Sequence, residues 1–205
     1  MLVKEETGIE LPNGGEAVKL HLRSEILALR DAALQLQGVQ RRRIPILSLI
    51  DKSTWLAREE GEDWLIWRAR RTVARLREMP IALSLGERIV GRPELRPSTT
   101  EEAKEIARLE EVAIPPHPGG DAGHFHPDYE KLFRVGIRGI REEIRSRCDA
   151  ATEAQEPFYR ACEMAMDGLS GYAMRVAQAC ESKASSNGGS GAQWIELARI
   201  CRHVS

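Results

Sequence analysis

Three histidines and an aspartate lie within one short stretch of the chain, and these residue types bind metals or move protons. His117, Asp121, His124 and His126 fall in segment 114–127, which also contains several prolines and glycines. Imidazole nitrogens and a carboxylate are typical zinc ligands. The prolines and glycines give these side chains no fixed frame, and no fourth ligand has a helical spacing. The sequence therefore predicts no metal site here, and the roles of His117 and His126 stay open.

His124 is the residue of this stretch that we single out as a functional residue. It follows Gly123 in an irregular segment and precedes the helix start expected at Pro127–Asp128. Binding residues are concentrated on loops held by a rigid scaffold. The structural alternative is a loop histidine that ties backbone carbonyls together or caps the next helix.

The four cysteines are candidates for nucleophilic or redox chemistry, but their spacing does not favour it. Cys148, Cys162, Cys180 and Cys201 form no CxxC pair, and the last three fall on apolar helical patterns. They are typical of buried, inert thiols in a reducing compartment. The polar N-terminus is unlike a signal peptide and no apolar stretch reaches membrane-spanning length, so we expect a cytoplasmic protein that binds no membrane.

Charge gives the chain no general attraction for nucleic acid. The formal net charge is −1, with 30% charged residues, so a basic effect must be local. Arginines do cluster at 41–43 and 68–77, and a nucleic-acid site is one interpretation of them. The alternative is a set of ion pairs, which nearby acids favour: Glu59, Glu60, Glu62 and Asp63. We predict ion pairs and no nucleic acid.

The periodicity predicts a mainly α protein with six to seven helices and one small β-hairpin. Residues 1–14 show no period and are expected to be a flexible N-terminus, leaving 15–205 as one helical region. The expected helices span about 16–37, 45–50, 62–79, 101–112, 127–144, 157–183 and 192–205. The hairpin is predicted within 81–90, around Gly86–Glu87, and a capping box at Ser98–Glu101.

Two of these helices carry unusual features. Gly136 and Gly139 interrupt the pattern after Pro127, and each costs about 1 kcal/mol of helix stability relative to Ala. That cost is tolerable where another backbone approaches closely. The last helix is expected to bury one face: Trp194, Leu197, Ala198 and Cys201.

Three segments carry motifs that occur in one order in a known enzyme family. An arginine-rich helix at 68–77 runs into GERIVG at 86–91. GHFHPDYEKL follows at 123–132, with GIRGI at 136–140. The third is FYRA at 158–161, leading to Tyr172 and Arg175. Together they resemble the glycyl radical enzymes of the pyruvate formate-lyase-like family, over residues 40–205.

The resemblance implies a fold, an activity and partners. The chain would be the N-terminal helical part of a pyruvate formate-lyase-like α/β barrel enzyme. That enzyme would be a radical lyase or dehydratase that acts on a small molecule in anaerobic metabolism. Its cofactor would be a glycyl radical, formed by an activating enzyme that uses S-adenosylmethionine. His124 would then be substrate-binding, since the family's matching histidine lies toward the substrate cavity.

The radical chemistry itself is expected to lie outside this chain. In the family, the catalytic cysteine and radical glycine meet inside a ten-stranded barrel, past the last motif matched here. A parallel barrel needs long crossover connections, and one hairpin cannot build it. Gly171, in Leu169–Tyr172, superficially matches the radical loop but falls within a helical pattern. We therefore expect no catalytic residue, no bound cofactor and no activity in this chain, truncated at its C-terminal end.

The alternative function is a non-catalytic helical module that binds a partner through an apolar surface. Both hypotheses leave apolar side chains uncovered where a barrel would pack, namely Phe133, Ile137 and Ile140. Self-association is one expected consequence. The last helix is expected to be the loosest element, because a Ser/Gly-rich break precedes it.

Overall fold

The computed structural model describes residues 27–28, 30–31 and 45–205, except 85–86, 88–89, 95, 116–126 and 187–190. The chain divides into two compact units, 1–42 and 43–205. In the first unit only four residues are described, all helical and exposed. They fall within the helix predicted at 16–37, and the rest of that helix lies outside the described residues.

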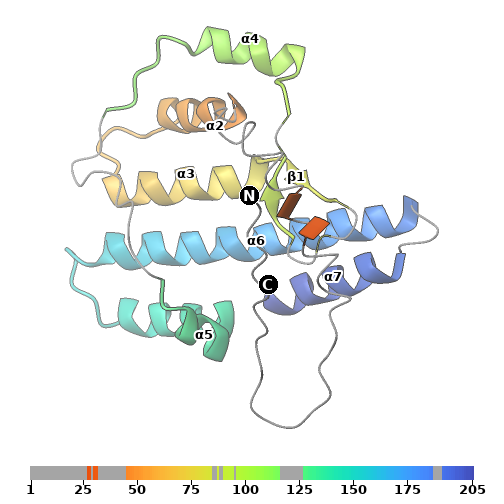
Figure 1. Cartoon of the computed structure of the whole chain (residues 1–205). Helices are drawn as coiled ribbons and strands as arrows, with labels where there is room; N and C mark the ends of the chain where they lie inside the picture. Colours follow the sequence, from red (N-terminus) through yellow and green to blue (C-terminus); the bar gives the residue numbers. More distant parts are fainter. Residues whose placement is uncertain are drawn as a thin grey trace, which may run out of the picture. The chain divides into compact units, whose positions relative to one another are not determined.

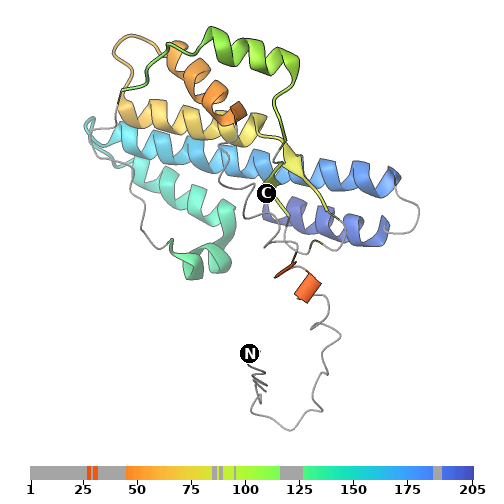
Figure 2. The same cartoon turned by 45° about the horizontal axis from the view of Figure 1, so that its top comes forward.

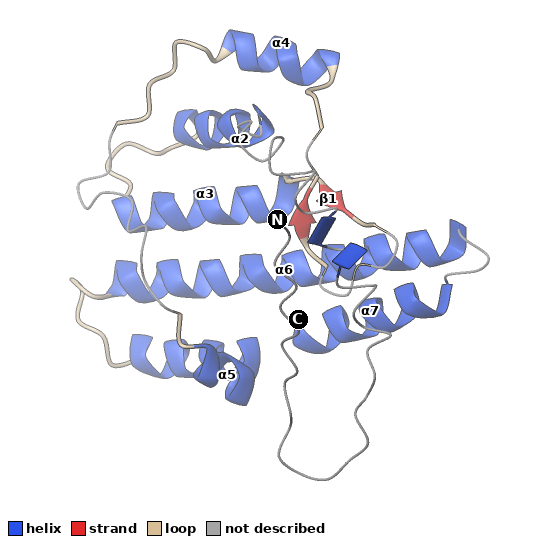
Figure 3. Ribbon diagram, viewed as in Figure 1, coloured by secondary structure: helices blue, strands red, loops and turns tan. Residues whose placement is uncertain are grey.

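The fold of the second unit is mainly α, as predicted. Its described residues form six helices: α2 (Pro45–Leu56), α3 (Trp64–Glu78), α4 (Thr100–Arg108), α5 (Tyr129–Cys148), α6 (Glu156–Ser186) and α7 (Gly191–Val204). Two short strands, β1 (Ile81–Ala82) and β2 (Arg92–Pro93), make the one sheet of the described part (Figure 3). No helix in this part is both long and apolar enough to cross a membrane.

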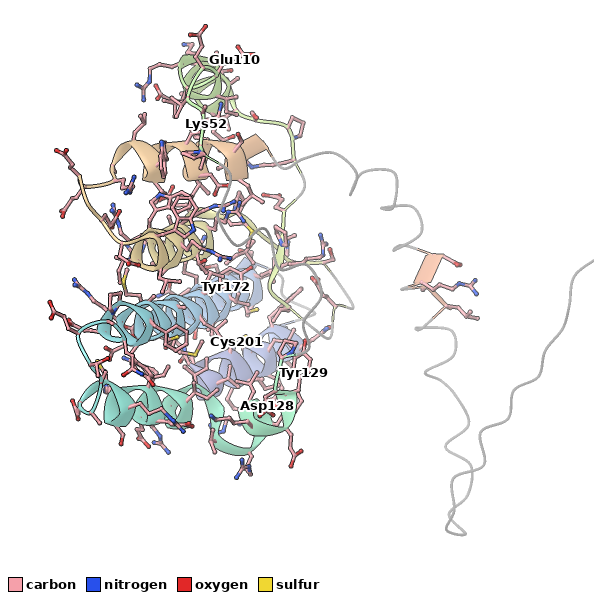
Figure 4. The ribbon with its side chains drawn as sticks, turned by 90° about the vertical axis from the view of Figure 1, so that its left-hand side faces the viewer. Lys52, Glu110, Asp128, Tyr129, Tyr172 and Cys201 are labelled. Atoms are coloured by element: carbon pink, nitrogen blue, oxygen red, sulfur yellow. The ribbon has the colours of Figure 1, made fainter. Side chains whose placement is uncertain are left out.

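The long helix α6 is the element around which the others are arranged. It runs beside α3 along its N-terminal half, and α2 and then α4 stack on the far side of α3 (Figure 1). On the other side of α6, α5 packs near its beginning and α7 near its end, as the turned view in Figure 2 also shows. Lys52 of α2 holds the end of α4 by donating to the carbonyls of Leu109 and Glu110 (Figure 4).

Side-chain caps set the starts of three helices. The Asp63 carboxylate accepts a hydrogen bond from the Leu65 N–H at the start of α3. Thr99 and Glu102 form a complete capping box at α4. The predicted box at Ser98–Glu101 was wrong by one residue, because the sequence STTEE at 98–102 offers two pairs with the same spacing.

The hairpin forms, but its second strand lies later than predicted. Ile81 pairs with Pro93 and Ala82 with Arg92, so β2 lies outside the predicted segment 81–90. Val90 packs instead against the core near α6 and α7. Gly91 then turns the chain at φ = +104°, a conformation that favours glycine. Pro93 is tolerated because both strands are edge strands.

The largest cluster of buried side chains lies between α6, α7 and the hairpin. It contains Val176, Ala177, Cys180, Trp194, Leu197, Ala198 and Cys201. The four residues predicted to be buried on the last helix are all present, and Trp194 is fully buried. The expectation that this helix is the loosest element was wrong, since α7 supplies more than half of the cluster.

The glycine-containing helix α5 is interrupted rather than continuous. Gly136 has φ = 66° and ψ = −176°, so the helix breaks there and restarts. Ile137, just after the break, is 7% exposed, whereas Phe133, before it, is 83% exposed. Of the apolar residues expected to be uncovered, Phe133 is therefore exposed, Ile137 is buried and Ile140 is half-buried.

The crossing of α3 and α6 predicts opposite effects for two glycines of one helix. A methyl group at Gly168 would lie 3.1 Å from Cγ2 and 3.3 Å from Cα of Val73, whereas at Gly171 it meets nothing within 4 Å. Gly171→Ala should stabilise by about 1 kcal/mol through helix propensity. Gly168→Ala should destabilise by about 1 kcal/mol, because overpacking exceeds that gain. Urea unfolding measures both, and equal effects would contradict the close crossing.

Candidate functional site

The predicted substrate-binding residue His124 and the three residues weighed with it as metal ligands all lie in 116–126, outside the described part of the chain. They are His117, Asp121, His124 and His126. Among the residues that the structure does describe, no group of three or more histidine, cysteine or acidic side chains is placed to hold a metal ion. The site can therefore be built only from the elements that follow and surround this segment.

The helix that follows the histidine segment begins where the sequence predicted. Oδ1 of Asp128 accepts a hydrogen bond from the Lys131 N–H at 2.8 Å and caps the start of α5. Tyr129 and Phe133 lie one turn apart, with stacked rings whose centroids are 6.2 Å apart. They are 56% and 83% exposed (Tyr129 is labelled with Asp128 in Figure 4). The capped start of α5 thus presents an aromatic pair to solvent.

Residues of the first and third motifs meet where the hairpin and the end of α3 pack on α6. The Tyr172 hydroxyl of α6 donates to the Gly91 carbonyl at 2.6 Å, across 81 residues of sequence. One turn later, Arg175 donates to the carbonyls of Leu76 at 2.6 Å and Met79 at 3.1 Å. These five residues are called the hairpin junction below, and Tyr172 is labelled in Figure 4.

The side chains of the hairpin junction have a structural role. Burial raises the pKa of Tyr172 above its usual value, although Arg175 opposes this, so the phenol stays protonated and acts as a donor. The guanidinium of Arg175 lies 5.9 Å from the Tyr172 ring centroid. It also satisfies carbonyls left unpaired at the end of α3. The raised pKa makes the Tyr172 phenol unsuited to proton transfer at neutral pH.

The cysteines are placed as unreactive thiols. Burial raises the pKa of Cys180 to about 11, with Cys201 beside it adding to the effect. Burial also raises the pKa values of Cys201 and Cys162. Cys162 is half-buried rather than in the core, and so is Cys148. Because the thiolate is the nucleophile, these shifts disfavour nucleophilic chemistry at Cys162, Cys180 and Cys201. Gly171 lies inside α6, as its pattern predicted.

Three arginines of α3 form ion pairs within the chain. Arg71 and Arg75 both bind the carboxylate of Asp51, which is 8% exposed and lies on α2. Burial alone raises the pKa of Asp51, but hydrogen bonds from the two arginines outweigh it and hold the pKa below its usual value. Arg70 pairs with Glu62 at 2.7 Å. The prediction of ion pairs is therefore confirmed for these arginines, but of the four acids proposed only Glu62 takes part and Asp51 was not among them. Arginines 41–43 lie outside the described residues.

A pocket of about 570 Å³ lies between the beginnings of α3 and α6. Its lining includes five acids and two arginines: Glu59, Glu62, Asp63, Glu153, Glu156, Arg70 and Arg160. Asp63 caps α3 and Glu156 opens α6. Acidic residues at helix starts are favourable in their own right, so local helix stability accounts for these two. Sequence reasoning missed the pocket, because its two walls are 90 residues apart.

One protein family matches more than half of the chain. The family model described as "Pyruvate formate lyase-like" matches residues 94–205. This span contains the second and third motifs, including Tyr172 and Arg175 of the hairpin junction. Among curated proteins, none matches the sequence.

Solved structures of glycyl radical enzymes share the fold. The glycerol-bound form of the B12-independent glycerol dehydratase from Clostridium butyricum matches with a TM-score of 0.66 at 16% identity, over 77% of this chain. A Roseburia inulinivorans structure described for 1,2-propanediol dehydration matches with a TM-score of 0.63 at 18% identity, over 78%. A glycyl radical enzyme from Archaeoglobus fulgidus gives 0.60 at 21% identity, over 76%. The chain spans 28% of the length of each of these structures.

The hairpin junction predicts that Arg175 contributes far more stability than a surface arginine. Arg175→Ala leaves two carbonyls at the end of α3 without their charged donor and should cost about 1.5–3 kcal/mol. Arg199→Ala is the matched control, because the Arg199 side chain is 69% exposed and its one ion-pair partner among the described residues is Glu196. This substitution should cost much less stability, because exposed ion pairs contribute little. Urea unfolding compares the two, and similar losses would contradict the structural role of the junction.

Proposed function

Because the chain belongs to the pyruvate formate lyase-like family, we propose that it forms the helical N-terminal part of a glycyl radical lyase or dehydratase. The observation that carries this proposal is the joint presence of the family match and the shared fold over three quarters of the chain. The enzyme acts on a small molecule. The two dehydratase structures favour small polyols, with cleavage of a C–O bond, over the other bond types.

The proposal places the radical chemistry in polypeptide beyond the segment that this chain matches. Most of each relative's length lies outside the match. The cysteines whose pKa values are raised are poor nucleophiles. Gly171 lies at an exposed position of a helix, where a Cβ would meet nothing within 4 Å. The chain by itself is then inactive. It holds no cofactor and acts as a scaffold.

Within that scaffold, His124 is the proposed substrate-binding residue. It belongs to the GHFHPDYEKL motif, whose C-terminal half forms the capped start of α5. A capped helix start close behind His124 is a suitable anchor for a binding segment. The full enzyme is cytoplasmic and anaerobic, and its radical is formed by a partner that uses S-adenosylmethionine.

A second candidate function is a non-catalytic interaction module. The observation that favours it is the stacked Tyr129–Phe133 pair, which is well exposed at the start of α5. Large exposed aromatic side chains are typical of protein–protein contact sites. The two functions differ in whether the sequence of the gene continues past Ser205 with a catalytic-cysteine loop and a late radical-glycine motif.

The scaffold proposal predicts that the chain alone is catalytically silent. Anaerobic incubation with an activating enzyme of the family and S-adenosylmethionine should give no glycyl radical signal by electron paramagnetic resonance. Glycerol and 1,2-propanediol should stay unconverted, with an intact glycyl radical dehydratase as the positive control. A doublet radical spectrum from the 205-residue chain would overturn the proposal.

The exposed aromatic pair predicts self-association of the isolated chain. Burying one large apolar side chain is worth about 1.5–3 kcal/mol, so Phe133→Ser should weaken association by about 10- to 100-fold. Phe158→Ser is the matched control, because Phe158 is 52% exposed but lies on α6 and not on α5. Light scattering across a concentration series measures the effect. Equal weakening by both variants would show that α5 is not the contact surface.

A further inference from the structure

The interruption of α5 divides it into two parts with different surroundings. Residues 129–135, called the arm below, carry the exposed aromatic pair, and residues 137–148 pack on α6. Two ion pairs bind the second part to α6: Arg141 to Asp167 at 2.5 Å and Arg145 to Glu163 at 2.7 Å. Between the described residues of the arm and α6, no ion pair is recorded.

The conformation at Gly136 is one that glycine alone adopts readily. Its φ of 66° and ψ of −176° fall in a region essentially closed to residues with a Cβ. Yet a Cβ built at Gly136 would meet nothing within 4 Å. The obstacle to another residue there is therefore the backbone angle and not a neighbouring group.

The same bend also favours glycine at position 139, but there the reason is lack of space for a side chain. A Cβ at Gly139 would lie 2.7 Å from Cβ of Val135. In a continuous helix, side chains four residues apart keep their Cβ atoms about 5–6 Å apart. The arm is thus folded back over Gly139, and the neighbour for which this glycine leaves room belongs to the same helix.

One ion pair closes the bend. Nζ of Lys131 on the arm lies 2.5 Å from Oε2 of Glu143 on the packed part. In a continuous helix these residues, twelve positions apart, would be separated by roughly 18 Å along the axis, which is farther than the two side chains reach. Hydrogen bonding from Lys131, helped by Arg147, lowers the pKa of Glu143, which therefore carries its charge at neutral pH.

We propose that Gly136 and Gly139 form a hinge, about which the arm exchanges between the folded-back form and a continuous α5. Phe133 is exposed in the folded-back form, so little apolar burial holds the arm there. The Lys131–Glu143 pair, with 34% and 37% side-chain exposure, is a weak surface latch. A straight helix would recover the interrupted backbone hydrogen bonds at the break.

The hinge would place the Tyr129–Phe133 pair in two positions relative to α6. A partner that covers the pair in only one form would shift the population toward that form. The hinge does not depend on the proposed enzymatic function, since it rests on contacts within α5. A silent chain without radical chemistry is therefore compatible with it.

Nuclear magnetic resonance tests the hinge directly. In the wild-type chain, a nuclear Overhauser effect should join the Val135 methyl groups to the Gly139 Hα, because Cγ2 of Val135 lies only 3.2 Å from the position of a Cβ on Gly139. Gly136→Ala and Gly139→Ala should each reduce it at least about fivefold, while helical circular dichroism stays level or rises. The control Gly171→Ala should leave it unchanged.

A charge substitution tests the latch with a matched control. Glu143→Gln should reduce the same signal at least about twofold, whereas Glu142→Gln should not, because Glu142 pairs weakly with Arg138 and not with the arm. Persistence of the wild-type signal in Gly136→Ala would overturn the hinge. So would a loss of helical signal or of folding in both glycine variants, since the bend would then be a rigid requirement of the fold.

Discussion

The close approach of α3 and α6 at Gly168 is the constraint on which the rest of the fold depends. Val73 backbone and side-chain atoms occupy the space that any larger residue at Gly168 would need. With the two helices at this distance, Arg175 reaches the last carbonyls of α3 and Tyr172 reaches Gly91. The hairpin is then fixed against α6, where it covers one side of the buried cluster with α7.

Features encoded by neighbouring residues could be predicted from the sequence. Asp128 caps α5 from the residue before it, and the four-residue face of α7 follows from its own period. Both need only helix geometry. The glycines of α5 were also recognised as a cost. The spacing of these glycines did not indicate the backbone angles of Gly136. Those angles interrupt the helix, which the sequence had predicted to be continuous.

Features that depend on partners far away in the sequence could not be predicted. The residues next to Asp51 in the sequence do not indicate that it forms ion pairs with two arginines of the next helix. The second strand lies after Val90 and not before it, because Val90 packs against the core. That contact is tertiary and gives no signal in the local sequence. Phe158 lies four residues before Cys162 in the same helical period but is exposed, so the period of α6 alone did not show where the helix is covered. The predicted histidine site, centred on His124, lies outside the described residues.

The residues that carry the family resemblance fall into two groups with different physical roles. Tyr172, Arg175 and Asp128 are used within the chain, where they satisfy backbone groups and fix helices. Tyr129 belongs to the other group: it mainly faces solvent and stacks on Phe133, which directly follows the motif and is more exposed still. Exposed parts of aromatic rings add little to the stability of the chain that carries them. A motif that combines both groups therefore encodes a scaffold together with a surface whose use depends on what binds it.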